Sequence, residues 1–153
     1  MSDYLKGKAV RKITEGIAVE RDAALPPQSD TEDLFTVVGG RVLLKQIIGE
    51  VTTQIGNVAN ATKLEHNPDD ASAGDMCGTV DIDNDDVGTV YGITGTVGTA
   101  MQKSTDVLLA QASPQILKAG AIEITCAGSS VSGGIKWTVV YVPIDDGAYI
   151  ETA

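Results

Sequence analysis

Residues 34–55 read "LFTVVGGRVLLKQIIGEVTTQI", and this stretch decides the fold class. Two runs rich in β-branched residues flank Gly39-Gly40, a dipeptide that tolerates the positive φ of a tight turn. β-branched side chains favour strands over helices. The pattern therefore predicts two strands joined in a hairpin at Gly39-Gly40. The second strand carries apolar residues on both faces, which predicts burial on much of both sides.

Further runs of this kind follow at short spacing. Residues 61–67 ("ATKLEHN") and the runs on either side of residues 84–86 predict short strands, and residues 104–113 ("STDVLLAQAS") fit either a helical turn capped by Ser104 or a strand. Two later runs each alternate cleanly, with one apolar face formed by Ile122, Ile124 and Cys126 and the other by Ile135, Trp137, Val139 and Tyr141. Short strands separated by Gly-rich turns are typical of sandwiches. We predict an all-β chain with a single β-sandwich or jelly-roll-like body over residues 31–153.

The first 30 residues differ from the rest. Four cations stand within seven positions, Lys6, Lys8, Arg11 and Lys12, so residues 1–12 carry +3 while the remaining 141 residues carry −13. Pro26 and Pro27 favour extended backbone. We predict an extended N-terminal arm over residues 1–30, with a short strand at 13–19. Because opposite charges attract across interfaces, the four cations are the predicted partner-binding residues.

Composition excludes several classes of function. The chain has 153 residues, enough for one domain, and a net charge of −10. That charge argues against binding to nucleic acid and to anionic membrane surfaces, since both need clustered cations on the bound face. No apolar run approaches the ~20 residues of a spanning helix. The first residues lack the apolar core of a secretory signal, so we expect the chain to stay in the cytosol.

The acidic stretch "DIDNDDVG", residues 81–88, raises the question of a metal site. Asp81, Asp83 and Asp85 match the first three ligand positions of a calcium loop. The sixth position holds Asp86 where the loop needs glycine, and the twelfth holds Gly92 where it needs glutamate. Asp and Asn are also common turn residues. We therefore predict a solvated hairpin turn, and a weak cation site remains the alternative.

No other set of residues predicts catalysis. His66 is the one histidine and has no marked catalytic partner, so we expect it at the surface or in a turn. Cys77 and Cys126 form no CxxC pattern, and we expect free buried thiols, with a disulfide between neighbouring strands as the alternative. Trp137 and Tyr141 share a strand face, which favours core packing over carbohydrate stacking. We predict a protein that is not an enzyme and has no cofactor and no metal.

Two long stretches carry a resemblance. They are "SDTEDLFTVVGGRVLLKQIIGEVTTQI", residues 29–55, and "AGAIEITCAGSSVSGGIKWTVVYVPIDDGAYIETA", residues 119–153. In their "LFTVVGGRV" opening, "GEVTT" and "GAIEITC" strands and "KWTVVYVPIDDGA" close, they resemble a family of tailed-bacteriophage virion proteins. These are the small head-decoration (cement) proteins and related minor structural proteins. The likeness spans most of residues 29–153 and leaves out residues 1–28.

The resemblance implies a structural role on a virion. It implies a β-rich protein, made in the host cytoplasm, that binds the major capsid protein and copies of itself on the capsid surface as a symmetric homo-oligomer, with a trimer favoured. Net charge far from zero keeps such a protein soluble before assembly. Two other roles stay open. One is a tail or fibre-attachment component, and the other is a calcium-dependent carbohydrate-binding module that uses the acidic loop and Trp137.

Overall fold

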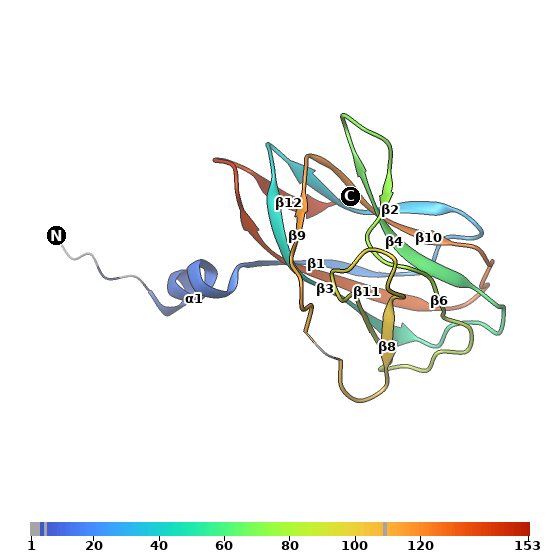
Figure 1. Cartoon of the computed structure of the whole chain (residues 1–153). Helices are drawn as coiled ribbons and strands as arrows, with labels where there is room; N and C mark the ends of the chain where they lie inside the picture. Colours follow the sequence, from blue (N-terminus) through green and yellow to red (C-terminus); the bar gives the residue numbers. More distant parts are fainter. Residues whose placement is uncertain (1–3, 5, 109) are drawn as a thin grey trace.

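The computed structural model describes residue 4, residues 6–108 and residues 110–153. Within them the chain forms one short helix followed by strands (Figure 1). In chain order these are α1 (Gly7–Glu15), β1 (Ile17–Ala24), β2 (Thr31–Val38), β3 (Val42–Thr53), β4 (Ala61–Pro68), β5 (Gly74–Asp75), β6 (Val80–Asp81), β7 (Val90–Gly92), β8 (Gln102–Ser104), β9 (Gln115–Leu117), β10 (Gly120–Cys126), β11 (Gly134–Pro143) and β12 (Tyr149–Thr152).

The strands form two packed antiparallel sheets. Sheet A has the order β1-β11-β3-β7-β8, with β9 also paired to β3, and sheet B has the order β12-β2-β10-β4-β5, with β6 also paired to β4. From β1 to β4, and again from β10 to β12, each strand lies in the sheet opposite to the strand before it. The prediction of an all-β sandwich is confirmed.

The hairpin predicted at Gly39-Gly40 is wrong. β2 pairs in sheet B and β3 in sheet A, so this turn carries the chain from one sheet to the other. Both glycines do have positive φ, 80° and 144°. The turn is held by Asp145, whose carboxylate accepts hydrogen bonds from the backbone N–H and the guanidinium of Arg41. A Cβ at Gly40 would lie 2.7 Å from Cβ of Asp145, so the close approach also requires glycine.

β3 keeps one fully buried face in spite of its irregular pattern. Val42 and Leu44 are buried, and so is Ile47, which lies an odd number of positions further on. A bulge shifts the alternation of side chains by one residue. Gln46 pairs with Val140 and Leu44 with Tyr141, so Lys45 between them has no partner on β11. The other face of β3 is half-buried. The prediction of burial on both sides therefore holds fully for one face only.

Neither alternative for residues 104–113 is correct. β8 ends at Ser104, and the described residues after it are irregular up to β9. The Ser104 hydroxyl accepts hydrogen bonds from the backbone N–H groups of Asp106 and Val107, as a cap would, but no helix follows. Gln111 ties the segment to β3, since its side chain donates to the Leu44 carbonyl. Contacts with β3, and not a regular local structure, therefore hold this segment in place.

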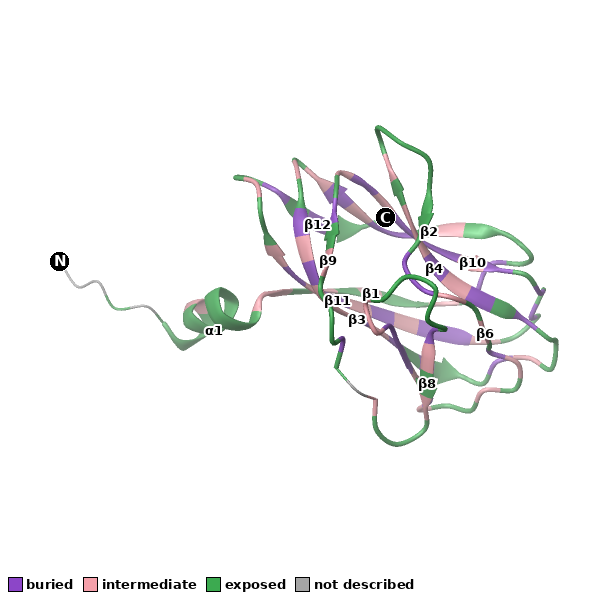
Figure 2. Cartoon of the chain, in the orientation of Figure 1, coloured by how far each residue is buried: buried purple, intermediate pink, exposed green. Residues whose placement is uncertain are grey.

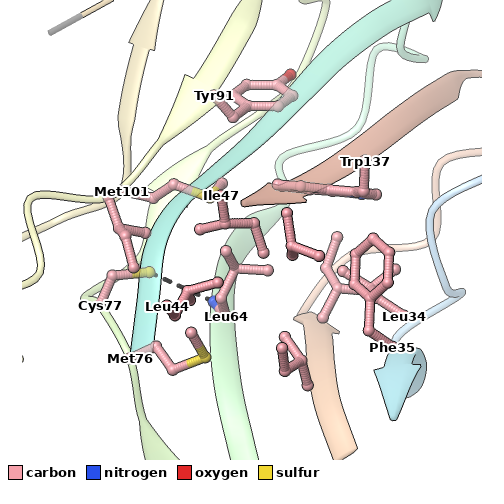
Figure 3. Close-up of a cluster of buried hydrophobic side chains, with 14 of the residues drawn as sticks. Leu34, Phe35, Leu44, Ile47, Leu64, Met76, Cys77, Tyr91, Met101 and Trp137 are labelled. Carbon is pink, nitrogen blue, oxygen red and sulfur yellow. Dashed lines mark hydrogen bonds between the residues drawn. The ribbon is translucent and has the colours of Figure 1, made fainter. Parts of the chain in front are cut away.

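The core lies between the two sheets (Figures 2 and 3). Trp137 on β11 is 2% exposed and stacks on Tyr91 of β7, with ring centroids 6.2 Å apart. Figure 3 shows the indole facing the apolar side chains that the two sheets contribute. The labelled members of this cluster are Leu34, Phe35, Leu44, Ile47, Leu64, Met76, Cys77, Tyr91, Met101 and Trp137. The prediction of Trp137 as a core anchor is confirmed.

The N-terminal segment is more ordered than the predicted extended arm. Residues 7–15 form helix α1, and residues 17–24 form β1, which hydrogen-bonds to β11 at the edge of sheet A. The predicted short strand at 13–19 therefore begins later, at Ile17. Pro26 and Pro27 are buried, because they close one end of the core beside Trp137.

Candidate partner-binding surface

The four predicted partner-binding cations lie on and just before α1. Lys6 occupies the N-cap position, and Lys8, Arg11 and Lys12 lie within the helix. At about 100° per residue, α1 has two opposite faces. One face carries Lys8, Arg11, Lys12 and Glu15, and the other carries Ala9, Val10 and Ile13. The sequence therefore places a basic face and an apolar face on one helix.

The apolar face of α1 is uncovered. The helix has no buried residue, and Val10 and Ile13 are 43% and 66% exposed. Figure 1 shows α1 standing away from the sandwich, and Figure 2 shows its surface as largely exposed. A side-chain contact to the body is made by Lys45, whose ammonium donates to the Glu15 carbonyl at 3.2 Å. Within the described chain, α1 thus lacks a surface that would hide its apolar side.

Local sequence gives α1 little stability of its own. The helix has nine residues, fewer than the ~12–15 at which isolated helices become marginally stable in water. Its N-cap, Lys6, makes no side-chain capping bond, and its first turn holds no acidic residue to offset the helix dipole. At the other end, Lys12 in the last turn and Gly16 at the C-cap are favourable. A helix of this kind is stabilised mainly by packing on another surface.

The cations of the body are already engaged. Of the chain's eleven Lys and Arg residues, four lie in residues 1–12, which leaves seven in the body. Six of these seven form ion pairs, namely Arg21–Glu32, Arg41–Asp145, Lys63 with Glu65 and Asp75, Lys103–Asp85, Lys118–Asp70 and Lys136–Glu20. The seventh is Lys45, described above. Within the described residues, the four arm cations make no such ion pair, while the body keeps a large excess of carboxylates.

The acidic stretch at residues 81–86 is not a hairpin. β6 precedes it in sheet B and β7 follows it in sheet A, so the stretch crosses between the sheets. Its carboxylates bind groups of the protein itself. Asp81 accepts from the backbone N–H of Asn60 and of Asp83, which lowers its pKa. Asp86 accepts from Gln54.

Asp85 is the most enclosed carboxylate of this stretch. Its side chain is 11% exposed, and it accepts the hydroxyl of Tyr91 at 2.7 Å and pairs with the Lys103 ammonium at 2.9 Å. Burial in turn raises the pKa of the Tyr91 hydroxyl. Among the described residues, no group of three or more His, Cys, Asp or Glu side chains could hold a metal ion. The stretch is therefore a crossing between the two sheets. The predicted hairpin is wrong, but the predicted turn is present and partly solvated, since residues 83–84 form a turn and Asp81, Asn84 and Asp86 are exposed.

The remaining candidates lie in or against the sheets. His66 is half-buried on β4, where Nδ1 lies 2.9 Å from the Ala121 carbonyl, and burial lowers its pKa. The prediction that His66 lies at the surface or in a turn is therefore wrong, because it is a half-buried strand residue. Cys77 and Cys126 are buried free thiols, which confirms that prediction, and burial raises both pKa values. Trp137 has no face open to a sugar.

One open groove accompanies these features. It lies between the β4–β5 hairpin and β9 and has a volume of about 370 Å³. It is lined by His66, Pro68, Ser72, Gly74, Asp75, Met76, Gly95, Val97, Gln115, Ile116 and Leu117. Sequence analysis missed this groove, because its residues come from four separated segments. The exposed Ile116, in a short strand between Gln115 and Leu117, gives no signal of its own.

Comparisons with known proteins assign no family or function to this surface. No protein-family model, no curated protein and no solved structure matches the chain. Among the described residues, no helix has the length and hydrophobicity needed to cross a membrane. A functional conclusion therefore depends on the surface itself, and above all on the unpaired basic helix that projects from an acidic sandwich.

Proposed function

We propose that this protein is a capsid decoration (cement) protein of a tailed bacteriophage. In this role it binds the major capsid protein and copies of itself on the outside of the head. It acts as a symmetric homo-oligomer and stabilises the shell. The role requires a rigid body, a repeated set of weak contacts and no active site.

The observation that carries the proposal is the pairing pattern of the cations. Every body cation is engaged within the chain, whereas Lys6, Lys8, Arg11 and Lys12 project on α1 without an ion pair among the described residues. A basic element of this kind is complementary to an acidic neighbour, and rim charges of this type set the rate and specificity of association. On a lattice, many weak arm contacts add through multivalency.

The fold is compatible with this role. A sandwich has two tightly packed sheets and a continuous core, so it serves as a rigid platform. The resemblance of residues 29–55 and 119–153 to decoration proteins supports the same conclusion. The calcium-dependent carbohydrate module is disfavoured, because Trp137 is buried and the carboxylates of residues 81–86 bind protein groups.

The test is co-sedimentation with expanded empty heads that lack this protein, taken from the virus that encodes it. The wild-type chain is expected to pellet with the heads in a saturable ratio. A variant with Lys6, Lys8, Arg11 and Lys12 all changed to Gln should bind more weakly, and its residual binding should depend less on salt. The control keeps the charge, with the three lysines changed to Arg.

Two results would contradict the proposal. If the wild-type chain does not sediment with heads but does sediment with purified tails, the protein belongs to the tail. If it sediments with heads and the Gln variant binds at full strength, the four cations are not the contact.

A further inference from the structure

The groove between the β4–β5 hairpin and β9 exposes apolar side chains at its edges. Val97 and Ile116 are 64% and 65% exposed, and Met76 and Leu117 lie buried beneath. With a volume of about 370 Å³, the groove is wide enough for a few aliphatic side chains.

The segments that form the groove carry more carboxylates than ammonium groups. Asp75 lines the groove itself, and Asp69 and Asp70 follow Pro68 at the end of β4. Lys63 pairs with Asp75 and with Glu65, and Lys118 pairs with Asp70. The best occupant is an apolar stripe with a cation near one end.

We propose that this groove receives helix α1 of a second copy of the same chain. Val10 and Ile13 are one turn apart on α1 and would enter beside Val97 and Ile116. Lys6 stands at the start of α1, where its long side chain can approach Asp75 at the edge of the groove. Lys8, Arg11 and Lys12 lie on the opposite face of α1 and stay available for another surface. This assignment rests on the proposed function, in which the arms join neighbouring copies.

The helix of the same chain falls short of the groove. Ile17 pairs with Tyr141, Tyr141 with Leu44, and Leu44 with Gln115, so three strand spacings, about 14 Å, separate Ile17 from β9. Ile13 precedes Ile17 by four residues, which span at most ~14 Å when fully extended. As part of a helix they span much less. A second copy is therefore the occupant, and the contact is head-to-tail, which closes into a ring at a suitable rotation.

The test uses two complementary variants and no capsid. The arm variant carries Val10→Ser and Ile13→Ser, and the groove variant carries Val97→Ser and Ile116→Ser. All four side chains are exposed, so both variants should keep the wild-type circular dichroism and melting temperature. A matched control, Val131→Ser, removes an exposed valine outside the groove. Molar mass is measured by light scattering after size exclusion over a range of concentrations.

We expect the wild type and the Val131 control to self-associate, and each double variant to do so about tenfold to a hundredfold more weakly. Mixing the two variants should restore a heterodimer, since one partner still has an intact arm and the other an intact groove. Self-association of both variants at wild-type strength would overturn the assignment. A monomeric wild type, or a mixture that stays monomeric, would also overturn it. Binding of either variant to empty heads is measured in a separate experiment. That result tests the proposed function and does not bear on the contact between α1 and the groove.

Discussion

Gly49 of β3 lies directly opposite Trp137 of β11, and a Cβ at Gly49 would lie 2.7 Å from Cζ3 of the indole. The indole therefore occupies the space that a side chain would need. This pair fixes the position of the largest core residue, which also stacks on Tyr91 of β7, the strand on the other side of β3. The relationship makes an unremarkable glycine one of the more constrained positions of the sandwich.

Gly49→Ala is expected to destabilise the protein by about 1–3 kcal/mol, the usual cost of overpacking a core. The measurement is urea unfolding followed by tryptophan fluorescence. Gly74→Ala is the matched control, because a Cβ there meets nothing within 4 Å and its φ is not positive. If both alanines cost the same, the contact with Trp137 does not explain the need for glycine.

Trp137→Ala is expected to cost about 3–5 kcal/mol, since it empties a large aromatic site between the sheets. In the wild-type protein, Trp137 fluorescence should be blue-shifted and protected from iodide and acrylamide. Emission near that of free tryptophan, with ready quenching, would contradict the core position and reopen a role in sugar stacking.

Asp85→Asn is expected to lower stability by about 1–3 kcal/mol, because it removes the charge that pairs with Lys103 in a largely enclosed site. The Asn side chain can still accept the Tyr91 hydroxyl, so the loss is partial. Asp83→Asn is the control, with an expected effect within about 0.5 kcal/mol. Chemical unfolding with and without added calcium checks both. Equal effects of the two changes, or a calcium-dependent gain in the wild type alone, would contradict the structural account of this stretch.

Acid should weaken the turn that joins the two sheets at Gly39-Gly40. Hydrogen bonds from Arg41 lower the pKa of Asp145 to about 2, below the 3.8 of a free side chain. A carboxylate with a lowered folded-state pKa stabilises the fold above its unfolded-state value, and this contribution is lost as pH falls towards 2. The difference in melting temperature between wild type and Asp145→Asn should be constant above about pH 5 and shrink between pH 4 and 2. Arg41→Gln should behave in the same way, and the double variant should be no worse than either single one. Additive effects would show that the two residues act independently.

The sequence predicted which segments form strands far better than how the strands pair. Alternation placed Ile135, Trp137 and Val139 on one buried face, because the pleat alone determines which side chains share a face. The pairing of β2 and β3 in different sheets could not be predicted. Gly39-Gly40 tolerates positive φ in a hairpin and in a crossing alike, and the choice depends on the distant Asp145.

The N-terminal segment shows the same limit. β1 reads "IAVERDAA", and the strand predicted at 13–19 covers only its first three residues. The rest has few apolar residues and forms a strand because β11 offers it an unpaired edge. The cations of α1 could be picked out from the sequence, since a local charge cluster is visible there. That the body cations are all engaged while those of α1 are not could be seen only once the ion pairs were known. The groove could not be predicted either, because Ile116 on β9 and His66 on β4 come together only once the two sheets pack.

Helix α1 and strand β1 should contribute differently to stability. Deleting residues 1–15 removes α1, which has no buried residue, so the melting temperature should stay within a few degrees of the wild type. Deleting residues 1–28 also removes β1 and the two prolines. It exposes the edge of β11 and removes Ile17, Val19 and the buried Pro26 and Pro27, which pack against the core. This longer truncation should lower the melting temperature strongly and promote aggregation, because a long unpaired strand edge is left open.

Thermal unfolding and light scattering of the two truncations, measured side by side with head binding, test these separate roles of α1 and β1. The shorter truncation should fold normally and bind heads weakly. Collapse of its fold would show that α1 is part of the body, and full-strength binding would show that the helix is not the contact.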